Sequence, residues 1–275
     1  FLACQARPVM DCEIEVEIGD LVRVPAIKNN AVISETEMLT SDIMRVVIQT
    51  EQNVEHAGLP GMWAELSIDG LDRPRSYSYA AAPKNEKPNE FTFFIRKVPG
   101  GKFTEWLFGN NRDMSQQVTV NGPFGSFYLR EKQSPIVCIA GGSGLAPIKA
   151  LLEGGVLDQV ERDVVFLFGA RTQEDLYCVN EIKELKDKWN KDYKFDFIPV
   201  LNMEPEDSDW QGGRGLVTDY FENEIIKKDN IDVSDWQGYL CGPPPMIDAA
   251  CEVLEKNGIK SDEIFYDKFT DSRDL

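Results

Sequence analysis

The hydrophobic and polar positions change their rhythm near residue 131. Before that point, short runs of β-branched and aromatic residues are separated by Gly, Pro and Asn, which is typical of strands joined by turns. This spacing predicts a small antiparallel β-barrel, interrupted by one short helix at 103–108. The strands are expected at 24–33, 43–49, 63–68, 76–80, 91–98 and 117–120.

After residue 131 the pattern alternates between buried-looking strands and helices. Such alternation predicts an α/β doubly wound parallel sheet with helices on both faces, whose ligands bind at the carboxyl ends of the strands. A chain of 275 residues is also long enough for about two domains. The strands are expected at 135–140, 164–168, 195–201, 238–241 and 264–266, and the helices at 145–152, 175–189, 218–226 and 245–257.

Composition narrows the functions open to these two domains. The chain carries 29 Lys and Arg against 47 Asp and Glu, and the net charge of −18 disfavours nucleic acid and anionic lipid as partners. No apolar run approaches the roughly 20 residues that cross a bilayer, so no membrane association is expected. The charge fits a basic or neutral partner and equally fits simple solubility.

Side chains that catalyse or bind metals on their own are scarce. His56 is the only histidine and lies in a polar stretch, which argues against a catalytic triad or a His-ligated metal. Six cysteines are scattered without a CxxC pair, as expected for reduced thiols in a cytoplasmic protein. A bound organic cofactor is therefore the natural source of activity.

A glycine-rich turn follows the first strand of the expected parallel sheet. Residues 141–144 read Gly-Gly-Ser-Gly between that strand and the next helix. Glycines let the backbone approach a pyrophosphate, and the free N–H groups at a helix start favour its charge. Pro147 stands where the dinucleotide fingerprint has its third glycine, so a tight structural turn stays an alternative to a phosphate cradle.

Two further strand ends place chemically active groups at the same edge of the sheet. Arg171 could pair with a 2′-phosphate, whereas Asp175 could cap a helix or accept from a ribose hydroxyl. Cys241, before Gly242 and Pro243, is either a thiol at the site or a small buried hydrophobe. These residues alone leave the phosphate state of the nucleotide open.

One strand of the barrel combines a guanidinium, aromatic rings and hydroxyls. Strand alternation puts Arg75, Tyr77 and Tyr79 on one face and Ser76 and Ser78 on the other. Generic strand composition would produce the same pattern, so this strand by itself does not decide between a site and a wall of the barrel.

Five motifs occur together along the chain. They are Arg75-x-Tyr77-Ser78, Gly-Gly-Lys-Phe-Thr at 100–104, Gly-Pro-Phe-Gly at 122–125, the turn at 141–147 and Tyr-Leu-Cys-Gly-Pro at 239–243. This set and its order resemble the ferredoxin–NADP reductase superfamily, and the chain is identified as a member of it. Within that superfamily it resembles the NADH-dependent reductase components of bacterial multicomponent oxygenases, such as those of benzoate dioxygenase, toluene monooxygenase and phenol hydroxylase.

The start of the chain extends the resemblance to an iron–sulfur centre. Residues 1–8 resemble the phrase that closes an N-terminal plant-type [2Fe–2S] domain in those reductases, with Cys4 as the fourth ligand. The other three cysteines of C-x4-C-x2-C spacing do not precede Cys4 here. We expect residues 1–22 to be a remnant of an upstream ferredoxin domain and linker, 23–131 the FAD-binding barrel, and 132–275 the NAD(P)H-binding domain. An unrelated thiol at Cys4 is the alternative.

The resemblance assigns roles around FAD. Arg75 and the turn at 101–104 would bind the pyrophosphate, Tyr77 would stack on the flavin, and Ser78 would lie within hydrogen-bonding reach of its N5 atom. Strand 94–97 would contact the flavin or its adenosine part. The predicted FAD residues are Arg75, Ser76, Tyr77, Ser78, Phe94, Ile95, Arg96, Lys97, Gly101, Lys102, Phe103, Thr104 and Phe269.

The resemblance also assigns a catalytic set and a gate around the nicotinamide nucleotide, with NADH expected rather than NADPH. Ser78, Cys241 and Asp267 correspond to the family's Ser, Cys and acidic trio, although most of these reductases carry Glu in the acidic position. Phe269, or alternatively Tyr266, would cover the flavin face that receives the nicotinamide. The predicted NAD residues are Gly142, Ser143, Gly144, Arg171, Asp175, Cys241, Gly242 and Pro243.

Three functions follow as hypotheses. The first is a reductase that passes electrons from NADH through FAD and its own ferredoxin domain to an oxygenase hydroxylase component or a small ferredoxin. The second feeds a haem protein, as cytochrome b5 reductase does, and the third is a non-catalytic flavin or nucleotide sensor. The phrase around Cys4 favours the first, and the set of Ser78, Cys241 and Phe269 favours either enzyme over the sensor.

Overall fold

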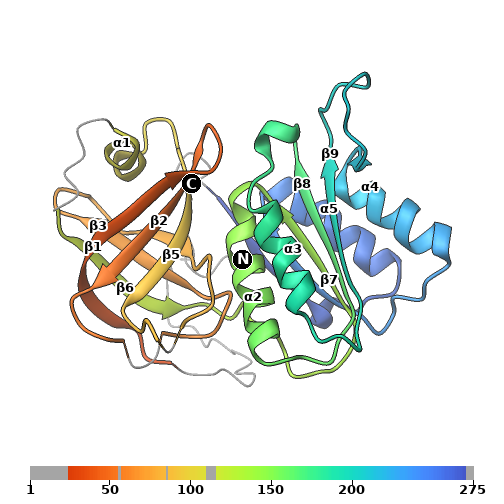
Figure 1. Cartoon of the computed structure of the whole chain (residues 1–275), viewed down its shortest axis with the longest axis horizontal. Helices are drawn as coiled ribbons and strands as arrows, with labels where there is room; N and C mark the ends of the chain where they lie inside the picture. Colours follow the sequence, from red (N-terminus) through yellow and green to blue (C-terminus); the bar gives the residue numbers. More distant parts are fainter. Residues whose placement is uncertain (1–23, 55–56, 85, 110–115, 271–275) are drawn as a thin grey trace, which may run out of the picture.

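The computed structural model describes residues 24–54, 57–84, 86–109 and 116–270, and it contains two six-stranded sheets. One sheet is antiparallel and curls into a barrel, and the other is parallel and flanked by helices (Figure 1). The predicted fold class, an antiparallel β-barrel joined to an α/β doubly wound parallel sheet, is confirmed. Cys4 and the expected ferredoxin remnant lie outside the described residues.

The barrel strands bury alternate side chains. The elements are β1 (Ile27–Met38), β2 (Ile43–Thr50), β3 (Trp63–Ile68), β4 (Arg75–Ser78), β5 (Glu90–Arg96), helix α1 (Lys102–Phe108) and β6 (Val118–Phe124). In β3, Ala64, Leu66 and Ile68 are buried and their neighbours are half-buried, as a period of two requires. The strand order is β4-β3-β6-β1-β2-β5, and a bridge between Tyr79 and Phe93 joins the two edges. Closure pairs backbone groups that free edges would expose.

The parallel sheet has the order β10-β9-β8-β7-β11-β12. Its strands are β7 (Ile136–Gly141), β8 (Val164–Ala170), β9 (Phe195–Leu201), β10 (Gly213–Arg214), β11 (Gln237–Gly242) and β12 (Ile264–Lys268), and its helices are α2 (Leu145–Leu157), α3 (Val179–Lys188), α4 (Val217–Tyr220) and α5 (Pro244–Lys256). Every residue of β7 and β11 is buried because helices cover both faces of the sheet. Within the described ranges, none of the helices combines the length and apolar character needed to cross a membrane.

Helix α2 packs between the parallel sheet and the barrel (Figure 1). The apolar cluster on that face of the sheet includes Ile148 and Leu151 of α2 and continues into the barrel through Ile43, Phe94 and Phe127. Removing such apolar surface from water stabilises the arrangement by roughly 25 cal/mol per Å². The two domains therefore share one continuous core, which limits their relative movement.

The single helix expected at 175–189 is divided in the structure, so that prediction is wrong. Thr172 and Asp175 form a capping box around the 3₁₀ turn Gln173–Asp175, and α3 begins only after Cys178, whose φ is +54°. Left-handed backbone is uncommon outside glycine and interrupts a helix. The division places the Asp175 carboxylate on a turn at the carboxyl end of the sheet.

Candidate functional site

The turn after β7 is rich in glycine, and two of its positions disfavour a side chain for different reasons. Gly142 has a φ of +55°, a conformation that residues with a Cβ rarely adopt. A Cβ on Gly144 would collide with the carbonyl group of Cys241, so the turn rests directly on the end of β11. Helix α2 starts at Leu145, immediately after this turn, and a helix start favours an anion. The turn therefore has the geometry of a phosphate cradle.

A cavity of about 280 Å³ opens in front of this turn. It lies at the carboxyl ends of β7, β8, β9 and β11, which is where ligands bind in open α/β sheets. Gly144 and Cys241 are buried and do not line it. The barrel closes its other side with Thr40, Asp42, Ile43 and Arg96. The predicted NAD residues that line it are Gly142, Arg171, Asp175 and Pro243.

Arg171 and Asp175 pair with each other inside this cavity. The guanidinium donates two hydrogen bonds, from Nε to Oδ2 at 2.9 Å and from Nη2 to Oδ1 at 2.7 Å. Burial would raise the pKa of Asp175, but Arg171 and the backbone N–H of Thr172 outweigh burial and lower it. The carboxylate is thus ionised at neutral pH, and it already matches the charge of Arg171.

Arg96, at the end of β5, reaches from the barrel to the glycine turn. Its Nε donates to Oδ2 of Asp42 at 2.8 Å, and its Nη1 lies 3.4 Å from the position that a Cβ on Gly142 would take. Arg96 thus belongs to the strand expected to contact FAD and also lines the cavity in front of the cradle. Asp42, which no motif marked, lies in the turn between β1 and β2.

Ser78, Cys241 and Asp267 come together from three strands. The hydroxyl of Ser78, at the end of β4, donates to Oδ2 of Asp267 at 3.4 Å. Cys241 and Asp267 are direct partners in the register of β11 and β12. Burial raises the pKa of Asp267 to about 6, although the hydrogen bond from Ser78 opposes the rise. Burial, with a contribution from Asp267, also raises the pKa of the Cys241 thiol, which stays protonated.

The two aromatic candidates near the chain's last strand differ in their surroundings. The backbone N–H of Phe269 donates to the carbonyl oxygen of Gly242 at 2.9 Å, and its half-buried ring packs against the core shared by the two domains. Tyr266 is 52% exposed, with the Lys268 ammonium 5.2 Å from its ring centre. The structure therefore brings Phe269, and not Tyr266, to the Gly-Pro turn after β11.

The polar side chains expected to bind FAD have protein partners in this structure. The Arg75 guanidinium donates to Oδ1 of Asp72 at 3.1 Å. Tyr77 is half-buried, and its ring centre lies 5.6 Å from that of Phe103. The Thr104 hydroxyl accepts from the N–H of Val98 at 3.1 Å and can donate to the Val98 carbonyl at 3.0 Å. Asp72 and the Val98 backbone therefore compete with a phosphate for Arg75 and Thr104.

Other residues of the predicted FAD set lie at different depths. Ile95 is fully buried in the barrel core, and Phe94 is buried between the domains, where it meets the Tyr177 ring edge-on at 5.5 Å. The Gly101 N–H donates to the Val98 carbonyl at 2.9 Å. The exposed residues of the set are Ser76, Arg96, Lys97 and Lys102.

Tyr177 is a member of the site that the sequence did not reveal. Its hydroxyl donates to the carbonyl oxygen of Gly142 at 2.8 Å and so fixes the glycine turn. Burial raises the pKa of this phenol well above its usual range, which keeps the donor protonated. Tyr177 stands two residues after Asp175 in a segment without a recognisable motif, so only the fold could place it.

The residues present fit FAD and a nicotinamide nucleotide. The glycine cradle, the helix start at Leu145 and Arg96 suit a pyrophosphate. The half-buried Tyr77 ring and the hydroxyl of the next residue, Ser78, supply the aromatic surface and the hydrogen-bonding group that a flavin needs.

Comparison with known protein families agrees with this geometry. Residues 138–252 match the oxidoreductase NAD-binding domain, and residues 30–128 match the oxidoreductase FAD-binding domain. The first match covers the parallel sheet up to β11 and most of α5, and the second covers the barrel.

Curated relatives share most of the chain. The xylene/toluene monooxygenase electron transfer component of Pseudomonas putida is 40% identical over 98% of this chain and 73% of that protein. The reductase component of propane 2-monooxygenase from Mycolicibacterium smegmatis is 34% identical over 98% of this chain and 76% of its own length. The ferredoxin–NAD(P)+ reductase component of the naphthalene 1,2-dioxygenase system of Pseudomonas putida is 34% identical, covering 98% and 77%.

Two solved structures share the whole architecture. The Amycolatopsis cytochrome P450 reductase superposes with a TM-score of 0.82 at 30% identity, over 98% of this chain and 78% of that one. The ferredoxin reductase of carbazole 1,9a-dioxygenase superposes with a TM-score of 0.75 at 27% identity, over 90% and 70%.

Proposed function

The chain belongs to the family of FAD- and NAD-binding oxidoreductases that includes the electron-transfer components of mono- and dioxygenases, and on that premise we propose the following reaction. It takes a hydride from NADH onto FAD and delivers the electrons one at a time to a [2Fe–2S] centre that serves an oxygenase. One observation carries the proposal. Ser78 ends β4, which we call the flavin strand, and its hydroxyl donates to Asp267 of the nucleotide domain, the register partner of Cys241 beside the cradle.

The chain's own residues bind and orient the two cofactors. FAD supplies the chemistry when bound, because it accepts a hydride and gives up single electrons. Tyr77 and Ser78 would bind the flavin ring, and Arg75 its pyrophosphate once Asp72 releases the guanidinium. The cradle and Arg96 would bind the nicotinamide nucleotide, with Phe269 covering its site.

Ser78 and Asp267 control one proton. While Asp267 is ionised, the single hydroxyl proton of Ser78 is donated to its Oδ2. When Asp267 is protonated, which its pKa of about 6 allows near neutral pH, the carboxyl group becomes the donor. The Ser78 proton is then free to point into the flavin site. The protonation state of Asp267 thus decides whether Ser78 donates a hydrogen bond toward the flavin site or accepts one there.

NADH is proposed as the donor in preference to NADPH. The two hydrogen bonds from Arg171 to Asp175 engage two of the N–H donors that a 2′-phosphate would use, and the Asp175 carboxylate would repel that phosphate. An Asp175→Asn variant should therefore improve the use of NADPH relative to NADH by about tenfold, since one charge is removed from the cavity. Comparing the rates of flavin reduction by the two nucleotides tests this, and a wild-type preference for NADPH would refute it.

The acceptor and the location are further parts of the proposal. Cys4 would be the fourth ligand of a [2Fe–2S] cluster in a ferredoxin domain upstream, and an oxygenase component or a small ferredoxin would take the electrons. The parent gene should then encode three cysteines in C-x4-C-x2-C order before Phe1.

A cytoplasmic location agrees with the free thiols of Cys138, Cys178, Cys241 and Cys251.

The central test is anaerobic reduction of the FAD-loaded protein by NADH. We expect the flavin absorbance to bleach with one NADH per FAD, and a Ser78→Ala variant to be reduced at least about tenfold more slowly. Ser67→Ala, a half-buried serine on the neighbouring β3, is the matched control and should behave like the wild type. A yellow protein that NADH does not bleach would be a binding protein, not a reductase.

A haem protein is the second candidate acceptor. The observation that favours it is the cytochrome P450 reductase with the same architecture, at 30% identity. The two candidates separate when the intact parent protein is reduced by NADH and mixed with acceptors. Reduction of a [2Fe–2S] centre before any haem supports the first, and direct reduction of a haem protein by a parent without the three upstream cysteines supports the second.

A further inference from the structure

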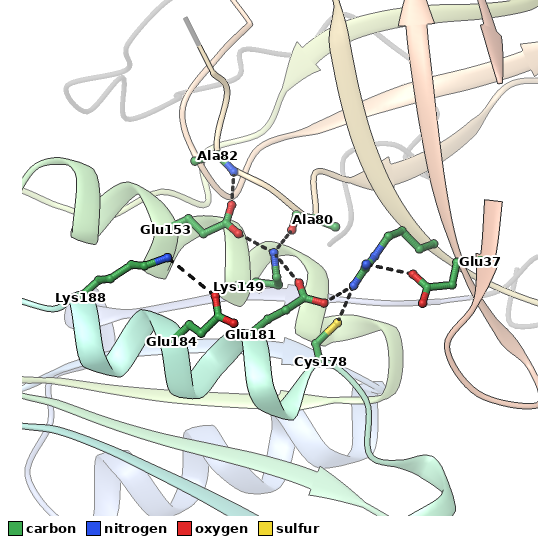
Figure 2. Close-up of polar contacts among 10 residues, drawn as sticks. Glu37, Ala80, Ala82, Lys149, Glu153, Cys178, Glu181, Glu184 and Lys188 are labelled. Atoms are coloured by element: carbon green, nitrogen blue, oxygen red, sulfur yellow. Dashed lines mark hydrogen bonds and ion pairs between the residues drawn. The ribbon is translucent and has the colours of Figure 1, made fainter. Parts of the chain in front are cut away.

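A cluster of charged side chains crosses the interface between the barrel and the nucleotide domain (Figure 2). We call Arg45, Lys149, Glu153, Cys178 and Glu181 the interface cluster; none of them lines the cavity. Lys149 of α2 is only 5% exposed, donates to Glu153, and lies 3.3 Å from Oε2 of Glu181. Arg45 of β2 donates to Glu181 and, at 3.2 Å, to the Cys178 sulfur. The Arg45–Glu181 ion pair therefore crosses the interface, whereas Lys149 pairs with two carboxylates of its own domain.

The interface cluster also binds the backbone that continues the flavin strand. Nζ of Lys149 donates to the carbonyl oxygen of Ala80 at 3.3 Å, and the N–H of Ala82 donates to Oε2 of Glu153 at 2.8 Å. Ala80 is two residues beyond Ser78 in the chain. Figure 2 shows both contacts beside Lys149 and Glu153. These bonds have directions, whereas the apolar contacts of the same interface do not.

Helix α2 therefore connects the two halves of the candidate site. It begins at Leu145, directly after the glycine cradle, and carries Lys149 and Glu153 one turn apart further along. A helix transmits position well because its backbone is internally hydrogen-bonded. A shift at Lys149 or Glu153 would therefore move the cradle relative to Ser78.

We propose that Lys149 and Glu153 are positioning residues for hydride transfer, an inference that rests on the function proposed above. They tie the helix that starts at the nicotinamide cradle to the backbone that leaves the flavin strand, and so fix the distance between the two cofactors. Hydride transfer needs reacting atoms roughly 3–3.5 Å apart, and a misplacement of about 1 Å costs about a hundredfold in rate. Two cofactors bound by different domains depend on such a tie.

The ion pair joins a buried Lys149 to a half-buried Glu153, and its energetics agree with a positioning role. Removing Lys149 and Glu153 from water offsets most of their mutual attraction, so the pair contributes little net stability. Its hydrogen bonds to Ala80 and Ala82 instead select one arrangement of the domains. The pair therefore specifies geometry more than it stabilises the fold.

The test uses stopped-flow reduction of the FAD-loaded full chain by NADH. For Lys149→Met we expect the limiting rate at saturating NADH to fall about 10- to 100-fold. The NADH concentration for half-saturation should change less than about threefold, because the cavity residues are untouched. The long-wavelength charge-transfer absorbance of the NADH complex, which reports stacking of the two rings, should weaken. Glu153→Gln still accepts from Ala82 and should show a smaller fall, and Lys149→Arg should recover part of the rate.

A matched control lies on the next helix. Lys188→Met removes a Lys–Glu pair with Glu184, also at i,i+4 spacing, which is 3.7 Å long, exposed and confined to α3. Its limiting rate should equal the wild-type rate. Figure 2 shows Lys188 and Glu184 on α3, joined to each other and not to the barrel residues that are drawn.

The outcomes separate the inference from the proposed function. If NADH does not reduce the wild type, the proposed function fails. If it reduces the wild type and both Lys149→Met and Glu153→Gln at the same limiting rate, only this inference fails. Should the single variants not fold, the double variant Lys149→Met, Glu153→Leu replaces the buried pair with apolar side chains, which proteins often tolerate. A folded, FAD-loaded double variant with a wild-type limiting rate would also overturn the inference.

Discussion

The proposed nucleotide site and the proposed flavin site of this protein are built from different parts of the chain. The phosphate cradle of the nucleotide site is made of backbone, because its glycine turn rests on β11 and the strand register aligns Ala140 with Cys241 and Cys241 with Asp267. The flavin site is made of side chains, of which Arg75 is bound to Asp72. The cradle is shaped by its backbone, whereas the Arg75 guanidinium is shared with Asp72.

The difference predicts how each site responds to substitution. A backbone-made site has no room for an added atom, so a small change there disturbs the fold itself. In a site made of paired side chains, the ligand competes with the protein partner of each side chain. A substitution of that partner therefore changes the affinity for the ligand. Three variants, taken in order of expected effect, test this comparison.

Gly144→Ala should have the largest effect. The new Cβ would meet the carbonyl carbon and oxygen of Cys241 and the N of Gly242, and these are backbone atoms that cannot rotate away. We expect a loss of about 3 kcal/mol or more in the free energy of unfolding and a loss of NADH-dependent flavin reduction. Gly169→Ala, whose Cβ would have its nearest neighbour at 3.5 Å, should leave the melting temperature nearly unchanged. Equal melting temperatures for both variants would show that the turn can relax.

Asp267→Asn should have an intermediate effect that depends on pH. Because the pKa of Asp267 is raised from 3.8 to about 6, the folded protein keeps a proton that the unfolded chain releases, and stability falls as pH rises across that window. The variant removes this cost, so at pH 8 it should be about 1–2 kcal/mol more stable than the wild type, with no difference below about pH 4. This stability difference is smaller than the free energy of two full pKa units, because solvent screens the half-buried carboxylate.

The same variant should change the rate of flavin reduction. In the wild type this rate should rise as pH falls through about 6, because protonated Asp267 frees the Ser78 proton. Asp267→Asn should remove that pH dependence, and Asp262→Asn, an exposed carboxylate near β12, should keep it. Thermal unfolding and stopped-flow rates between pH 5 and pH 8 measure both effects. An unchanged pH profile in Asp267→Asn would assign the ionisation to another group.

Asp72→Asn should have the smallest effect, and in the opposite direction. The hydrogen bond from Arg75 lowers the pKa of Asp72, so the carboxylate that competes for the guanidinium is ionised at neutral pH. Removing its charge should tighten FAD binding about two- to fivefold, as expected for an exposed ion pair. Asp69→Asn, an exposed carboxylate on the same loop, should leave FAD affinity unchanged. Weaker FAD binding in Asp72→Asn would mean that Asp72 orients Arg75 for the phosphate.

The sequence predicted the strands where local pattern and pairing agree. The bounds of β3 and β9 match the predicted ranges. β6 runs on to Phe124, beyond the predicted end at 120, because Gly122 and Phe124 still pair on either side of Pro123. A Gly-Pro dipeptide normally ends a central strand, so only the tertiary pairing reveals the continuation. In β1 a register shift at Ser34 changes the alternation, and the predicted strand stops there while the real one continues to Met38.

The sequence located the candidate site only where a motif marks it. The cradle, Ser78 and Cys241 could be named because glycines and short phrases around them are distinctive. Asp42 lies in a turn of the barrel and reaches the nucleotide cavity only through the packing of the domains. Lys149 looks like an ordinary surface lysine at i,i+4 from Glu153, and it is buried only because the barrel covers α2. Contacts between domains leave no local pattern to read.

Strand β12 has a consequence for how the protein fails on warming. It carries Asp267 and leads into Phe269, yet among the residues that the structure describes it lies at the edge of its sheet and pairs only with β11. An edge strand with a single ladder opens at a lower free energy than the domain as a whole. Amide hydrogens of 264–268 should therefore exchange sooner than those of β7. On heating, NADH oxidation should be lost several degrees below the melting temperature of the rest of the fold. The upper temperature limit of activity is then set by the local stability of β12 and not by that of the whole domain.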